Sequence, residues 1–201
     1  PLVTAVGGTQ LRTAGRGYTS VAWNDTDDRA WTLHAYGSTQ PVPTSSGGGK
    51  SEFFARPSYQ NGVKAVTGAM RGVPDISMSA SCDGAAEVYS TFPGQRPGWS
   101  LICGTSEATT EFAAIVALAD QVAGHPLGLI NPALYALSAR RAAGIVDVTS
   151  GNNTVSFYQG TPRTLHTVTG YPARAGYDLV TGVGTVNAAS FVYELAGVPG
   201  H

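Results

Sequence analysis

The amino-acid sequence predicts an α/β fold in which helices cover a mainly parallel sheet. Short apolar runs alternate along the chain with segments whose apolar residues recur at helical spacing, as in layered α/β proteins. The 201 residues, of which 42% are hydrophobic, can bury a substantial core and fit one domain better than two. The 26 glycines and 12 prolines are scattered among the apolar runs, so they indicate tight turns. We therefore expect one domain over residues 1–201.

The first half of the chain is expected to hold short strands and one short helix. Residues 2–6 form an apolar run stopped by two glycines, which predicts a buried strand feeding a turn. Residues 17–33 are aromatic and polar with weak alternation, which favours a hairpin or a long loop. Ser51 offers an N-cap to a short helix that Pro57 ends. Residues 72–80 predict a buried strand.

The second half shows a clearer alternation of helices and strands. Residues 87–92 and 99–103 flank a Pro-Gly pair and predict a hairpin. Residues 107–123 form the clearest helix, because apolar residues recur at three- and four-residue spacing and Gly124 closes the pattern. The remaining expected elements are a helix over 131–141, a strand over 145–148, a polar loop over 149–170 and a helix over 187–195.

Composition excludes several classes of function. Lys and Arg total 12 against 13 for Asp and Glu, so the net charge of -1 is unlike that of a basic nucleic-acid-binding protein. No apolar stretch approaches the roughly 20 residues that a membrane helix needs. The low charged fraction of 12%, with many Gly, Ser and Thr, suits a secreted protein. We expect no nucleic-acid partner, no membrane partner and an extracellular location.

The two cysteines, Cys82 and Cys103, lie 21 residues apart. They either close one disulfide in an oxidising compartment or remain two buried thiols. Neither belongs to a CxxC motif or to a Cys/His cluster, which argues against a zinc site.

Ser106 is the candidate catalytic residue. A β-like run ends in Gly104 and a long apolar helix starts at once, so Ser106 lies where free N–H groups and the positive end of the helix converge. A serine there can act as a nucleophile whose oxyanion those N–H groups stabilise, or it can simply be an N-cap. Glu107 and Glu111 follow at i,i+4 spacing, and we prefer charge matching to the helix dipole over an acid/base role for them.

Seven motifs resemble segments of the sedolisins, the serine-carboxyl peptidases with a subtilisin-like fold. Gly104-Thr105-Ser106, opening the segment 102–123, is similar to the nucleophile segment. The others follow in the order of the family: VTAVGGT at 3–9, SGGGKS at 46–51 with FxxPxYQ at 54–60, RGVPDIS at 71–77, NPALY at 131–135, GYD at 176–178 and TGVG at 181–184. The resemblance implies a three-layer subtilisin-like fold, of which this chain is the C-terminal part.

The resemblance also implies a mechanism. Sedolisins attack a peptide carbonyl with a serine, here Ser106, and use a Glu supported by an Asp as the base, with a further Asp in the oxyanion hole. A carboxylate still accepts a proton in acid, where imidazole is already protonated. In the family these three acids belong to segments that precede VTAVGGT. We therefore expect this chain to be inactive alone and to need a missing N-terminal half or propeptide of the same precursor, with peptides or proteins as substrates.

One position departs from the family pattern, and one matching position is expected to be structural. The family places Pro four residues after the nucleophile, where it rigidifies the first helical turn, and Thr110 stands there instead. Thr110 still allows a helix, but the departure slightly favours a non-catalytic relative. Asp75 follows Pro74 in the PDIS motif and is expected to be structural.

A structural calcium site is implied within residues 145–187. The ligands carried over from the family are the carboxylates of Asp147 and Asp178 and the main-chain carbonyls of Val148, Arg174 and Gly176. All are oxygen donors, as a hard cation requires. Arg174 replaces a usual Gly, so its carbonyl binds only if its backbone reaches the same conformation. Ordinary loop capping is the other interpretation of the two carboxylates.

Two other functions stay open. A non-catalytic pseudopeptidase or calcium-stabilised binding module would keep the fold without the chemistry. The other is an unrelated esterase-like hydrolase, although the sequence has no G-x-S-x-G motif. This function would require His34 or His166 within hydrogen-bond reach of Ser106.

Overall fold

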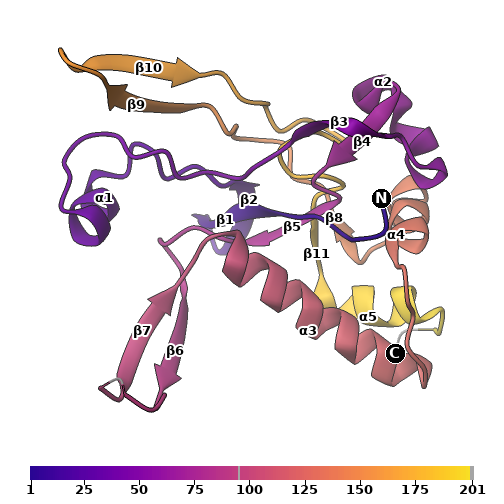
Figure 1. Ribbon diagram of the computed structural model, residues 1–201. Helices are drawn as coiled ribbons and strands as arrows, with labels where there is room; N and C mark the ends of the chain where they lie inside the picture. Colours follow the sequence, from indigo (N-terminus) through magenta and orange to yellow (C-terminus); the bar gives the residue numbers. More distant parts are fainter. Residues whose placement is uncertain (95, 200–201) are drawn as a thin grey trace.

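The computed structural model describes residues 1–94 and 96–199, and the side chains of all of these except 34–36. The chain combines helices and strands in one α/β arrangement (Figure 1). Its first elements are β1 (Val6–Ala14), β2 (Gly17–Ala22), α1 (Arg29–Tyr36), β3 (Gly49–Ala55), a 3-10 helix (Ser58–Val63), α2 (Lys64–Thr67), β4 (Met70–Val73), β5 (Ile76–Ser79), β6 (Ala86–Ser90) and β7 (Gly98–Ile102). Then come α3 (Thr105–Ala123), α4 (Asn131–Ala139), β8 (Ile145–Val146), β9 (Val155–Gln159), β10 (Thr164–Val168), β11 (Thr185–Val186) and α5 (Ala188–Ala196).

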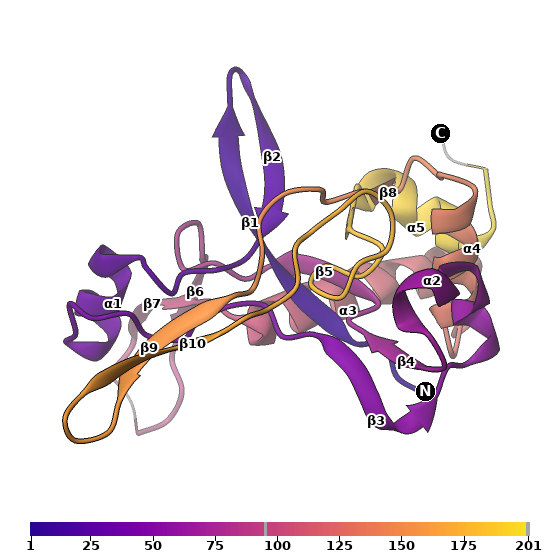
Figure 2. The ribbon, with the colours of Figure 1, turned by 90° about the horizontal axis from the view of Figure 1, so that it is seen from above.

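The expected α/β class is present, but the expected mainly parallel sheet is not seen. Within residues 1–94 and 96–199, the one parallel pair is β1 with β5, in a three-stranded sheet ordered β2-β1-β5. The remaining strands form antiparallel pairs, several of them hairpins that extend from the centre of the molecule (Figure 2). Short turns join the strands of these hairpins, whereas parallel pairing needs a long crossover between neighbours.

The core lies between β5 and helices α3, α4 and α5. Phe112 of α3 meets Phe191 of α5 at a ring-centroid distance of 5.8 Å. Ile76, Leu134 and Phe191 are fully buried in the same cluster. Figure 1 shows α3 and α5 side by side below β1 and β5. This packing fixes α3, whose first turn carries Ser106.

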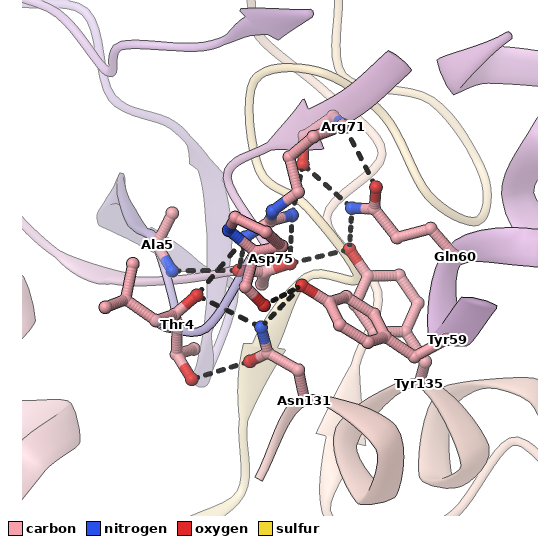
Figure 3. A network of polar contacts seen from close by, with 11 residues as sticks. Thr4, Ala5, Tyr59, Gln60, Arg71, Asp75, Asn131 and Tyr135 are labelled. Carbon is pink, nitrogen blue, oxygen red and sulfur yellow. Dashed lines mark hydrogen bonds and ion pairs between the residues drawn. The ribbon is translucent and has the colours of Figure 1, made fainter. Parts of the chain in front are cut away.

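A second, polar centre joins the N-terminal segment to β4 and α4 (Figure 3). Asp75 is fully buried and pairs with Arg71, whose two terminal nitrogens donate to it over 2.7 and 2.5 Å. The Tyr135 hydroxyl and the Ala5 amide each donate to the same carboxylate over 2.8 Å. Asn131 accepts a 2.6 Å hydrogen bond from Thr4. The structural role expected for Asp75 is confirmed.

Two short elements expected in the first half are wrong. Leu2 and Val3 are 79% and 70% exposed, and strand β1 begins only at Val6 and continues through the glycine pair. The glycines belong to the strand because its neighbours approach closely: a Cβ at Gly7 would lie 2.6 Å from Ser77 Oγ, and one at Gly8 would lie 2.7 Å from Ala80 Cβ. Ser51 lies in strand β3, although its hydroxyl still accepts from the amides of Phe53 and Phe54.

Patterns in the second half were more informative. The helices predicted at 107–123, 131–141 and 187–195 are confirmed as α3, α4 and α5, and the hairpin before Ser106 is confirmed as β6–β7. The loop expected at 149–170 is wrong, because it contains the hairpin β9–β10. In the first half, the strand expected at 72–80 is divided at Pro74 into β4 and β5. Among the described residues, no helix has both the length and the apolar character that crossing a membrane requires.

Candidate active site

Ser106 is the second residue of α3, and its side chain is exposed. Gly104 occupies the N-cap position with a φ of +86°, a conformation that favours glycine, so the N-cap interpretation of Ser106 does not hold. The Ser106 hydroxyl makes no hydrogen bond to the rest of the described chain. It is therefore free to meet a molecule that approaches the start of the helix.

The backbone around Ser106 leaves amide groups unpaired. The Gly104 amide donates to the Ala80 carbonyl over 2.7 Å, and the Gly104 carbonyl accepts from the Ala108 amide over 3.3 Å. The amides of Thr105 and Ser106 precede the first helical hydrogen bond and have no acceptor within the described residues. They can stabilise negative charge beside the serine, helped by the positive end of the helix dipole.

A disulfide and a buried carboxylate hold this turn in place. Cys82 and Cys103 are disulfide-bonded with a Cα–Cα distance of 5.1 Å, so the alternative of two free thiols is excluded. Asp25, only 3% exposed, accepts hydrogen bonds from Trp23 Nε1 at 2.7 Å, Ser81 Oγ at 2.9 Å and the Cys82 amide at 3.1 Å. Asp25 thus fixes the loop to which the strand before Ser106 is covalently tied.

The first turn of α3 also buries a carboxyl group. Glu107 is 3% exposed, and its Oε2 has no hydrogen-bond partner in the described part of the chain. Burial and the nearby Glu111 raise the pKa of Glu107 to about 7, against a smaller opposing effect of the Ala86 amide. Burial also raises the pKa of Glu111. Glu107 is thus uncharged in acid, where the expected matching of its charge to the helix dipole does not operate.

Thr110 keeps the turn helical where the family pattern has Pro. Its hydroxyl donates to the Ser106 carbonyl over 3.0 Å and to the Glu107 carbonyl over 2.9 Å. Thr109 bonds one turn back in the same way, to the Thr105 carbonyl over 2.7 Å. The turn is therefore helical with Thr110 in place of Pro, as expected.

The residues expected to bind calcium lie around one loop. Asp147 Oδ2 accepts from the Gly176 amide over 2.8 Å, and Asp178 Oδ2 accepts from the Arg174 amide over 2.8 Å. Asp178 is buried and also accepts from the Val180 and Thr181 amides. Val148 is buried next to Asp147, which is exposed and lines a cavity of about 470 Å³ with Gly176.

The donor chemistry of this loop fits a hard cation, since both carboxylates and all the carbonyls are oxygen donors. Within the described ranges, no group of three or more His, Cys, Asp or Glu side chains could hold a metal ion. A cation at this loop would therefore depend on backbone carbonyls as much as on side chains.

Comparison with known proteins identifies relatives of this chain. No protein-family model matches the chain. Kumamolisin of Bacillus sp. (strain MN-32) is 33% identical over 92% of the chain, and sedolisin of Pseudomonas sp. (strain 101) is 31% identical over 94% of it. A solved structure of Pseudomonas sedolisin, described as a serine-carboxyl proteinase complexed with two molecules of pseudo-iodotyrostatin, superposes on 97% of the chain with a TM-score of 0.73 and 30% identity.

The chain is a sedolisin homologue. It spans 29% of the length of kumamolisin, 28% of that of the curated sedolisin and 46% of the solved sedolisin chain. Human tripeptidyl-peptidase 1 is 31% identical over 75% of the chain. The likeness thus covers nearly all of this chain but a minority of each relative.

In this sedolisin homologue, the described residues provide no acid or base partner for Ser106. No carboxylate or histidine among them is hydrogen-bonded to Ser106. His125 Nδ1 lies 3.1 Å from the carbonyl oxygen of its neighbour Pro126, and the His166 ring stacks on Phe157 in the β9–β10 hairpin. The His34 side chain and His201 lie outside the described residues. Nothing in the described structure therefore supports an esterase-like triad with histidine.

Sequence reasoning missed Asp25 and the burial of Glu107. Asp25 belongs to a cluster with Asp27 and Asp28 that looks uniformly polar in the sequence. The neighbouring Trp23 was the available signal, because a buried indole N–H usually needs an acceptor. Nothing local distinguishes Glu107 from an exposed acid in a first helical turn.

Proposed function

We propose that this chain is the nucleophile-bearing, C-terminal portion of a secreted serine-carboxyl endopeptidase that acts in acid on peptides or proteins. The observation that carries the proposal is the exposed, unbonded Ser106 hydroxyl at the start of α3, in a homologue of the sedolisins. The Cys82–Cys103 disulfide supports an oxidising, extracellular type of compartment.

In the proposed reaction, Ser106 Oγ attacks the peptide carbonyl carbon while its proton passes to a carboxylate. A carboxylate with a pKa near about 4 still accepts a proton where imidazole, with a pKa of about 6.5, is already protonated. The unpaired amides of Thr105 and Ser106 support the negative oxygen of the tetrahedral intermediate. The base, its supporting Asp and the oxyanion Asp would come from polypeptide that precedes this chain in the precursor, so the chain alone should be inactive.

The proposal is tested on the complete precursor and on residues 1–201 alone. We expect the complete protein to cleave a denatured protein substrate at about pH 3 to 5 and to lose activity toward neutrality as the oxyanion acid ionises. A peptide aldehyde should form a covalent adduct at Ser106 in the complete protein and none in residues 1–201, as read by mass spectrometry. An adduct on another residue would remove Ser106 from the mechanism.

The alternative is a pseudopeptidase or binding module, favoured by the lack of any carboxylate bonded to Ser106 in the described residues. It predicts a folded complete protein that neither cleaves substrate nor forms the adduct at any pH between 3 and 8. The same experiment therefore separates the two functions.

We further propose that calcium binds the loop of Asp147 and Asp178, with the carbonyls of Val148, Arg174 and Gly176 as the other protein ligands. Support comes from the all-oxygen donor set and from the hydrogen bonds by which backbone amides hold both carboxylates against the same loop. The ion would be structural, tying the segment before α5 to the core.

Calcium at about 100 times its dissociation constant should stabilise the protein by about 2.7 kcal/mol, which raises the unfolding temperature by about 5 to 10 °C at this size. Differential scanning calorimetry with calcium and with chelator measures this shift. Asp147→Asn should abolish it, whereas Asp27→Asn, at an exposed position, should leave it unchanged. An equal calcium response in the wild type and Asp147→Asn would reject the site.

A further inference from the structure

Helix α3 follows the β6–β7 hairpin directly (Figure 1). Glu107 is the third residue of this helix. Its side chain is buried beside Ala108, which is itself fully buried against Trp23 and Ala80. Ser106 and Thr109, on either side of this buried pair, are exposed. The rotation of the first turn of α3 therefore determines together that Glu107 is inside and that Ser106 is outside.

The buried site suits a neutral carboxyl group and not a carboxylate. Oε2 of Glu107 has no donor in the described residues, and an unpaired buried charge is strongly unfavourable. The helix dipole would favour the charged form, but its effect is smaller than that of burial.

Within the described part of the chain, no nearby cation compensates for a charge on Glu107. Helix α3 contributes Glu111, a like charge. Strand β6 contributes the amide of Ala86, and its neighbour Glu87 is exposed. Strand β5 has no ionisable side chain, while Asp25 and Asp83, on the loops around β5, already accept hydrogen bonds from other groups.

We propose that Glu107 is a positioning residue for Ser106: while protonated, its buried carboxyl group holds the first turn of α3 in the orientation that exposes the Ser106 hydroxyl. When ionised, Glu107 leaves the interior for water and displaces that turn. The Cys82–Cys103 disulfide and the Gly104–Ala80 hydrogen bond hold the chain before the turn, so the displacement falls on residues 105–109. The inference rests on the proposed function only where Ser106 is taken as the nucleophile.

The sign of the pH dependence follows from the raised pKa. Burial moves the pKa of Glu107 from 4.5 to about 7, so the folded turn binds its proton more tightly than an opened turn does. The stabilisation is complete below pH 4.5 and is lost progressively as the pH rises to about 7. The switch would therefore act between acid and neutral conditions.

Hydrogen–deuterium exchange of the Ala108 and Thr109 amides in the full chain, corrected for intrinsic exchange, tests the inference, because these are the first amides of α3 that the helical turn pairs. Protection of these amides should fall by about two orders of magnitude between pH 4.5 and 7. Glu107→Gln, a neutral isostere, should keep the protection nearly constant over that range. Glu107→Met provides a second neutral side chain if the Glu107→Gln variant folds poorly. Glu87→Gln, at an exposed position of β6, should behave as the wild type.

Equal pH dependence in the wild type and both neutral variants would overturn the inference, as would wild-type protection that does not change with pH. A purely structural Glu107 would alter protection by the same factor at every pH. The exchange measurement needs no catalysis. A pH-dependent turn in a complete precursor that shows no peptidase activity would therefore reject the proposed function and leave the role of Glu107 standing.

Discussion

Replacing Ser106 with alanine is expected to lower kcat/KM for peptide hydrolysis by the complete protein by about four to six orders of magnitude. The substitution removes the one oxygen that would form the acyl-enzyme, and leaves the amides that support the oxyanion. The side chain is exposed and makes no hydrogen bond within the described chain, so its loss should not disturb the fold. Cleavage of a quenched fluorescent peptide at about pH 4, with the unfolding temperature as a second readout, measures both effects.

Ser100→Ala is the matched control for this experiment. Ser100 is also an exposed serine, on strand β7 four residues before Gly104, and its hydroxyl makes one long hydrogen bond to the Val88 carbonyl. The control should retain wild-type kcat/KM. If Ser106→Ala kept the activity of the control, the nucleophile would have to be sought elsewhere.

Asp75→Ala is expected to destabilise the protein by about 3 to 5 kcal/mol. The substitution leaves the buried Arg71 guanidinium without its counter-charge, and removes the acceptor of the Tyr135 hydroxyl and the Ala5 amide. The affected contacts join the N-terminal segment, β4 and α4, so several elements lose their connection together (Figure 3). Urea unfolding at neutral pH, followed by circular dichroism, measures the loss.

Asp27→Asn, at an exposed carboxylate, should change the unfolding free energy by less than about 0.5 kcal/mol. The double variant Arg71→Met with Asp75→Leu removes both charges and should recover part of the stability, because no unpaired charge is left buried. A loss in Asp75→Ala no larger than that in Asp27→Asn would contradict the structural role of the pair.

Helix α3 illustrates what local sequence can predict. Its apolar residues recur at helical spacing and Gly124 adopts a left-handed conformation at its end, so both the helix and its limit were predicted from neighbouring residues. The strand-to-helix turn at Ser106 and the hairpin before it were predicted in the same way. These features depend on residues close together in the chain.

The sequence by itself therefore determined helices α3, α4 and α5, the β6–β7 hairpin, the position of Ser106 at a helix start and the likeness to the sedolisins. Only the tertiary structure decided that the strand pairs are mostly antiparallel, that β3 is a strand, that Asp25 supports the Cys82 loop and that Glu107 is buried beside an exposed Ser106. The physical reason is the separation along the chain between the residues that are in contact. Helical periodicity and turns arise from contacts a few residues apart, whereas strand partners and the burial of a carboxyl group depend on segments that approach from distant parts of the chain.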